Sequence, residues 1–144
     1  MVDQILVSVR LTRRFDASPE RVFDAWLQPE IARRWLFTSP ASQSHTTEID
    51  PRVDGKWRIT DRRDGVDYVG HGEYLEIDRP RRLVFSFGMP QFSPEFNRVT
   101  VEIEPDGAGC RLTLTQERAP ASAQAGLEQG WREMFDQLDA VLAV

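Results

Sequence analysis

His71 lies two residues before Glu73 in a segment that reads as a β-strand. Histidine titrates near neutral pH, and residues two apart project from the same face of a strand, here the face opposite Tyr68 and Tyr74. If that face is inward, the pair forms a polar spot in an apolar pocket, with shifted pKa values that suit acid–base catalysis. A register slip of one residue, or a bulge at the neighbouring glycines, reverses the orientation. His71 and Glu73 are therefore conditional catalytic candidates.

Other reactive side chains offer less chemistry. His45 lies in a polar segment, where we expect it to be solvated. Cys110 precedes Arg111, which could activate its thiol, but a buried, inert thiol is the expected state. The sequence contains no nucleophile elbow, phosphate loop or metal-ligand spacing. We therefore expect no cofactor and no metal. The sequence does not settle whether the protein is an enzyme, but it favours a protein without catalytic activity.

Aromatic side chains recur along the chain and form the largest group of candidate functional residues. Ligand pockets are mostly apolar with a few placed polar groups, although the same side chains could fill a packed core. Phe92 differs, because it lies between prolines in residues 88–94, where it could cover a pocket mouth or mediate self-association. The candidate ligand-binding residues are Phe23, Trp26, Trp35, Phe37, Trp57, Tyr68, Tyr74, Phe85, Phe87, Phe92, Trp131, Phe135 and Leu138.

The composition is that of one globular domain covering residues 1–144, with 40% hydrophobic and 28% charged residues. A chain of this length buries about 68–70% of its unfolded surface, enough for a core without disulfides. The net charge of −5 disfavours nucleic acid and anionic membranes as partners. No apolar run approaches the roughly 20 residues of a membrane span. The single cysteine and the absence of a basic, apolar leader predict a cytoplasmic location.

The first third of the chain reads as a strand followed by two short helices. Apolar and polar side chains alternate over residues 5–12, as in a half-buried strand. Ser18 and Pro19 fit the N-cap and first position of a helix, and Pro29 ends that helix and begins another. Residues 39–47 are polar and aperiodic, which predicts a loop.

The remainder reads as a strand meander followed by one long helix. The steps Asp64-Gly65 and Asp106-Gly107 indicate tight hairpins, and such short connections join antiparallel neighbours. After Pro120, apolar residues from Leu127 to Leu142 recur at helical spacing. The predicted fold class is therefore α+β, with a curved antiparallel sheet of about six or seven strands wrapping a long C-terminal helix.

Three glycines lie inside these predicted elements. Gly70 and Gly72 share one strand, where they indicate sheet curvature, which we favour, or a close approach to the backbone. Gly130 lies inside the long helix, where glycine costs about 1 kcal/mol relative to alanine. It would permit close packing or widen a cavity, and the sequence does not choose between them.

The order of the elements resembles the helix-grip fold of the SRPBCC superfamily, which includes START-like and Bet v-like proteins. The resemblance rests first on the motif FDASPERVFDAW at residues 15–26, followed by Pro29-Glu30 and Arg34-Trp35. The motifs GKWR at 55–58, GEYLEI at 72–77 and PRRLVF at 80–85, with the pair Gly130-Trp131, are similar to one branch. That branch is named for the activator of the 90-kDa heat-shock protein ATPase (AHSA-type), and the resemblance covers nearly the whole chain.

The resemblance implies an apolar cavity between sheet and C-terminal helix, where superfamily members bind lipids, polyketides or other apolar molecules. Our first hypothesis is therefore a protein that binds a hydrophobic small molecule. A cyclase- or hydrolase-type enzyme acting on a lipid- or polyketide-like substrate is the second hypothesis, and it requires converging polar groups in the cavity. A co-chaperone-like regulator of a heat-shock chaperone ATPase is the third, with the chaperone as partner. Monomer and homodimer both stay open.

Overall fold

The computed structural model describes residues 5–143. In chain order the elements are β1 (Leu6–Phe15), α1 (Pro19–Leu27), α2 (Pro29–Ala32), β2 (Ser44–Ile49), β3 (Lys56–Arg63), β4 (Val66–Asp78), β5 (Arg82–Phe87), β6 (Asn97–Asp106), β7 (Gly109–Pro120), a 3-10 turn (Ala121–Ala123) and α3 (Gln124–Leu142). The predicted strand, helix pair, meander and terminal helix therefore occur in the predicted order.

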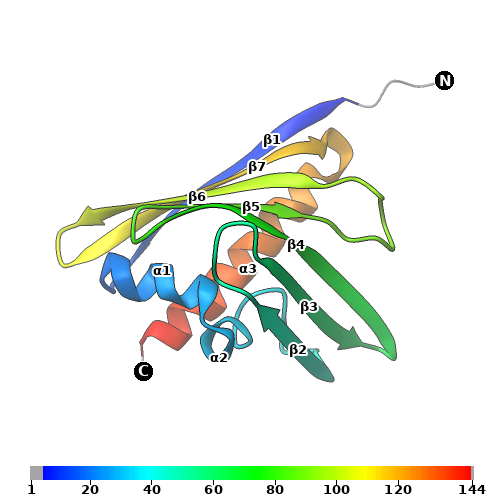
Figure 1. Ribbon diagram of the computed structural model, residues 1–144, viewed down its shortest axis with the longest axis horizontal. Coiled ribbons are helices and arrows are strands. Elements are labelled where there is room, and N and C mark those ends of the chain that lie inside the picture. The colour runs from blue at the N-terminus through cyan, green and yellow to red at the C-terminus, as the bar shows by residue number, and fades with distance from the viewer. Residues whose placement is uncertain (1–4, 144) are drawn as a thin grey trace.

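The strands form one seven-stranded sheet in the order β1-β7-β6-β5-β4-β3-β2, with antiparallel neighbours throughout. The sheet curves over α3, and α1 and α2 lie on the same concave side (Figure 1). All three helices thus share one layer, and the opposite face of the sheet carries no helix among the described residues. The α+β helix-grip architecture predicted from the sequence is confirmed.

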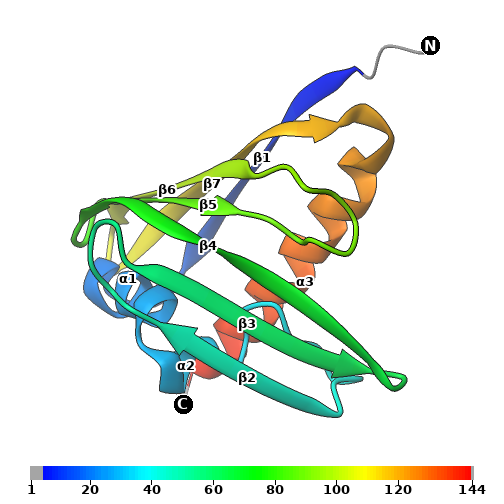
Figure 2. The ribbon, with the colours of Figure 1, turned by 45° about the vertical axis from the view of Figure 1, so that its right-hand side comes forward.

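Strand β4 is the place where the sheet divides. Its first part pairs with β3, from Arg63 opposite Val66 to Lys56 opposite Glu73. Its last part pairs with β5, with a register shift after Tyr74, and such bulges bend a strand. The β3–β4 hairpin consequently swings away from β5, as Figure 2 shows. An opening at one end of the concave face follows from this split.

Local sequence accounts for the turns and helix starts. The Ser18 hydroxyl accepts a hydrogen bond from the Arg21 N–H at 3.2 Å, which makes Ser18 the N-cap of α1. Asp64 and Gly65 both have positive φ, 52° and 76°, as expected for a type I′ hairpin turn. Both predicted hairpins, β3–β4 and β6–β7, are present.

Residues 44–49 form strand β2, which corrects the prediction of a loop over residues 39–47. His45, Thr47 and Ile49 are half-buried, while the residues between them are exposed. The strand lies at the edge of the sheet and pairs with β3 alone. An edge strand with one face in solvent needs little apolar surface. Its side chains are therefore mostly polar, and the alternation of apolar and polar residues that indicates a strand is absent from the sequence.

The apolar stripe of α3 packs into the concave face of the sheet. Trp131, Phe135, Leu138 and Leu142 are buried, as the helical spacing predicted, whereas Leu127 is only partly buried. The Trp131 indole N–H donates to Gln116 Oε1 on β7 at 2.9 Å. Among residues 5–143, no helix is long and apolar enough to cross a membrane.

Candidate functional site

The space between the middle of the sheet and the helices is filled by side chains. Trp26 lies at its centre, edge-on to Trp35 at 4.7 Å and tilted against Phe85 and Trp131 at 6.0 Å each. The void beside Trp26, Trp57 and Phe85 measures only about 10 Å³, the space of about one water molecule. Nine predicted ligand-binding residues therefore form the packed core: Phe23, Trp26, Trp35, Trp57, Tyr74, Phe85, Trp131, Phe135 and Leu138.

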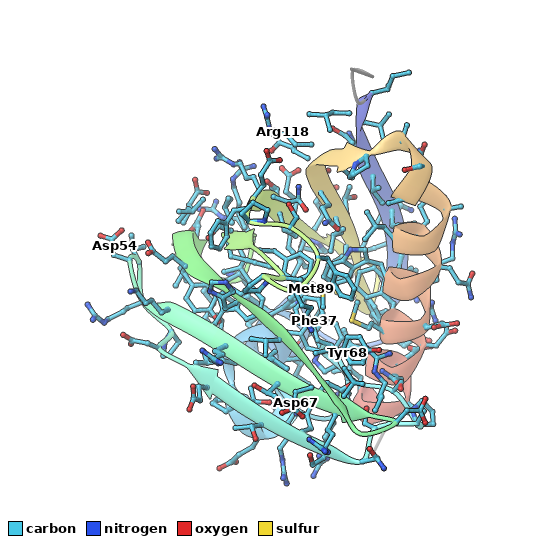
Figure 3. The ribbon with its side chains drawn as sticks, turned by 90° about the vertical axis from the view of Figure 1, so that its right-hand side faces the viewer. Phe37, Asp54, Asp67, Tyr68, Met89 and Arg118 are labelled. Carbon is cyan, nitrogen blue, oxygen red and sulfur yellow. The ribbon has the colours of Figure 1, made fainter. Side chains whose placement is uncertain are left out.

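An open cleft of about 660 Å³ lies at the end of the concave face where β3 and β4 diverge from β5. Three predicted ligand-binding residues line it, namely Phe37, Tyr68 and Phe87. Figure 3 shows Phe37, Met89 and Tyr68 between β4 and α3. This volume lies within the range of small-molecule sites, which is about 300–1,000 Å³.

One wall of the cleft is formed by α3, through Gly130, Met134 and Gln137. A Cβ added at Gly130 would meet nothing within 4 Å, so no packing contact requires glycine there. Gly130 thus leaves the cleft wider than any other residue would. Of the two explanations that the sequence left open, the structure favours the widened cavity.

The opposite wall comes from the sheet, where Gly70 and Phe87 lie side by side. A Cβ at Gly70 would come within 3.2 Å of the Phe87 ring, and one at Gly72 within 1.8 Å of the Ser86 carbonyl oxygen. That oxygen also accepts a hydrogen bond from the Trp57 indole N–H at 3.1 Å. The close approach of β5 therefore requires glycine at position 72, in addition to the curvature that the sequence suggested.

Phe37 separates the cleft from the small core void, because its side chain lines both. The ring stacks on Phe87 at 4.9 Å and on Trp57 at 5.5 Å. Its backbone has a positive φ of 51°, a conformation uncommon for an aromatic residue. The Phe37 N–H points to the Met134 sulfur at 3.1 Å, which ties the segment after α2 to α3.

Asp61 places a buried carboxylate in the wall of this cleft, whose lining combines aromatic and thioether side chains with polar ones. The residue is only 2% exposed, and neither carboxylate oxygen receives a hydrogen bond. Arg63 Nε lies 2.9 Å from Oδ2, close enough for an ion pair, but this N–H makes no hydrogen bond. The Arg63 guanidinium instead lies over the Tyr68 ring, 4.5 Å from its centre. The ion pair with Arg63 compensates the buried charge, but buried oxygens that accept no hydrogen bond are rare in folded proteins.

Sequence reasoning did not identify Asp61, although a signal was present. Trp57 and Ile59 alternate inward along β3, and Asp61 continues the same alternation. A charged residue on the inward face of a strand is a candidate functional group, because burying it without a partner is costly.

His45 lies opposite Asp61 in the β2–β3 register and is half-buried, which corrects the expectation of a solvated side chain. Its Nε2 lies 3.2 Å from the Leu36 carbonyl oxygen, which can only accept, so Nε2 carries a proton. Its Nδ1 lies 3.0 Å from the Thr47 hydroxyl. Burial is the main cause that lowers the pKa of His45 below its ordinary value.

His71 and Glu73 point away from the cleft, so the catalytic pair suggested by their spacing does not form inside it. The inward positions of this part of β4 are Gly70, Gly72 and Tyr74, which are buried, whereas Glu73 is exposed. His71 packs edge-on against Phe96 at 5.1 Å on the outer face. The two side chains share one face of β4, as strand alternation predicted, but that face is the outer face of the sheet.

The remaining candidates are also outside the cleft. Phe92 is 66% exposed and stacks on Tyr68 at 6.1 Å, so it lies beside the cleft without lining it. Cys110 is buried, and burial raises the pKa of its thiol, in agreement with an inert thiol. Within residues 5–143, no group of three or more potential ligands is placed to hold a metal ion.

Comparison with known proteins identifies the family. The model of the family described as "Activator of Hsp90 ATPase homolog 1-like protein" matches residues 16–143. No curated protein matches the chain.

Solved structures share the fold along nearly the whole chain. A protein from Chromobacterium violaceum is 26% identical, with a TM-score of 0.83 over 94% of this chain and 96% of its own. A protein of unknown function from Staphylococcus aureus is 22% identical, with a TM-score of 0.85 over 98% and 96% of the two chains. One from Arthrobacter aurescens is 28% identical, with a TM-score of 0.81 over 94% and 86%.

Proposed function

We propose that this chain, which belongs to the family of Activator of Hsp90 ATPase homolog 1-like proteins, binds an apolar small molecule in the cleft between α3 and the β3–β4 hairpin. Aromatic and thioether side chains line part of the open cleft, and its volume of about 660 Å³ suits a small organic ligand. We also propose a cytoplasmic location, because a single unpaired cysteine suits a reducing compartment.

The observation that carries this proposal is Gly130. Glycine inside a helix costs about 1 kcal/mol relative to alanine, and the surroundings of Gly130 would accept a Cβ without a clash. Packing therefore does not require glycine at position 130, and its lack of a side chain leaves the α3 wall of the cleft open to a ligand. Gly126, in the first turn of the same helix, is also free of neighbours within 4 Å but lies outside the cleft.

The two glycines allow a matched test by Gly130→Leu and Gly126→Leu. Both variants replace a helical glycine by the same good helix former, but only the first fills the cleft. Native mass spectrometry and thermal shifts against lipids, sterols and aromatic polyketide-like molecules give the readout, because a ligand of the folded state raises its unfolding temperature. We expect at least one ligand to bind the natural protein and Gly126→Leu with similar affinity. Its affinity for Gly130→Leu should be lower by roughly tenfold or more.

Two outcomes would refute the proposal. One is that no molecule of the panel binds the natural protein. The other is that Gly130→Leu binds the same ligand as tightly as Gly126→Leu does, which would place the ligand elsewhere.

The enzymatic and co-chaperone hypotheses have less support. An enzyme would need converging polar groups, and His71 with Glu73 lies on the outer face. The family description names an ATPase activator, so regulation of a chaperone ATPase stays a second hypothesis. No change in the ATPase rate of the 90-kDa chaperone with excess protein would reject it.

A further inference from the structure

The Asp61 carboxylate in the wall of the cleft is ion-paired with Arg63, but its oxygens accept no hydrogen bond. It is 2% exposed, it lines the cleft, and both oxygens lack a hydrogen-bond donor. A carboxylate readily accepts several hydrogen bonds, and leaving a buried acceptor unsatisfied is unfavourable. This carboxylate therefore has an incomplete environment in the structure.

Arg63 does not complete that environment. Its Nε lies 2.9 Å from Asp61 Oδ2, close enough for an ion pair, but neither Asp61 oxygen accepts a hydrogen bond. The guanidinium plane is held over Tyr68, the residue directly opposite Asp61 in the β3–β4 register. A cation over an aromatic face is stabilised there, so Arg63 is shared between the Tyr68 ring and the Asp61 carboxylate.

The charge around the cleft is predominantly negative. Three carboxylates, those of Asp61, Glu133 and Asp136, line it together with the single guanidinium of Arg63. Arg13, which does not line the cleft, compensates part of this charge at 2.7 Å from Asp136. An anionic end of a ligand would therefore be repelled, and a neutral donor or a cation would be accepted.

We infer that the cleft takes an amphipathic molecule whose polar end is a hydrogen-bond donor, a hydroxyl or an ammonium group, directed at Asp61. Its apolar body packs between Phe37, Phe87, Met89 and Met134, which are apolar residues of the cleft lining. This inference rests on the proposed function and adds the class of ligand, its orientation and the residue that selects it. Asp61 is a specificity-determining residue in this arrangement.

Three probes with one aromatic body and different polar ends test the inference: naphthylmethylamine, naphthylmethanol and naphthoate. Titration calorimetry on the natural protein should give tighter binding for the amine and the alcohol than for the carboxylate. The affinity of the amine or the alcohol, which can donate to the carboxylate, should exceed that of the repelled naphthoate by about ten- to one-hundred-fold. This comparison uses the natural protein, so it does not depend on the folding of any variant.

The variant Asp61→Asn should lower the affinity for naphthylmethylamine by about tenfold or more and reduce the discrimination against naphthoate. Asp67→Asn is the matched control, because Asp67 is an exposed residue of the same hairpin, paired with Arg62 outside the cleft. We expect the control to bind all three probes as the natural protein does.

The outcomes separate the inference from the proposed function. If the three probes bind the natural protein equally and none binds Gly130→Leu, the role of Asp61 is overturned, but binding of a ligand in the cleft is supported. An unchanged preference in Asp61→Asn would also overturn it. Absence of binding by every probe would overturn the inference, and it would overturn the proposed function as well only if no lipid, sterol or polyketide-like molecule of the panel binds.

Discussion

At the scale of single residues, the cleft is distinguished by three side-chain choices that stability alone does not favour. Gly130 forgoes helix propensity, the buried Asp61 carboxylate accepts no hydrogen bond, and Phe37 adopts a positive φ. Local departures of this kind concentrate at functional sites. Their coincidence around one opening is the reason to place function there.

Glycines 72 and 130 should respond oppositely to alanine. Gly72→Ala places a Cβ 1.8 Å from the Ser86 oxygen, so we expect destabilisation of about 1–3 kcal/mol. Gly130→Ala meets nothing within 4 Å and should stabilise the fold by up to about 1 kcal/mol. Urea denaturation of both variants measures the difference, and effects of the same sign would contradict this assignment of the two glycines.

His45 should make the protein less stable as the solution becomes mildly acidic. Burial lowers its pKa from the ordinary value of 6.5, so between 6.5 and the folded-state pKa the unfolded chain binds more protons. Stability therefore falls as the pH drops through this window. Denaturation midpoints should show this fall more strongly in the natural protein than in His45→Gln. Identical pH profiles of the two proteins would show that His45 is not the group responsible.

At the scale of elements, the fold was predictable where alternation and helical spacing are strong. The first strand, the Ser18-capped helix, both Asp-Gly hairpins and the stripe of α3 all occur as predicted, because each depends on neighbours in sequence. Strand β2 was missed because an edge strand is held by its pairing with β3, which is a long-range interaction. Its polar side chains carry little local signal.

Hydrogen exchange should rank the strands by their position in the sheet. β7 pairs on both sides, with β1 and β6, whereas β2 pairs only with β3. We expect the amides of β7 to exchange most slowly and those of β2 to exchange fastest among the strands, because edge pairing opens at lower free energy. Equal protection of β2 and β7 would contradict this order.

At the scale of the whole molecule, the sheet bends at β4 and creates an opening at only part of the concave face. Where β4 pairs with β5, the layer between sheet and helices is filled by Trp26 and its aromatic neighbours. Where the β3–β4 hairpin diverges, the side chains do not meet, and the cleft forms. Gln91 covers the free edge of β4 there, donating to the Asp67 carbonyl oxygen at 3.0 Å.

Sequence alone determined the elements other than β2, their order and most of the apolar side chains that face inward, because hydrophobic periodicity and turn chemistry are local properties. It could not determine which aromatic residues fill space and which border it, since both groups have the same periodicity. The inward direction of Asp61, the outward direction of His71 and the open space beside Gly130 depend on sheet register and on the bend at β4. Those features arise from contacts between segments far apart in the chain, and only the tertiary structure decided them.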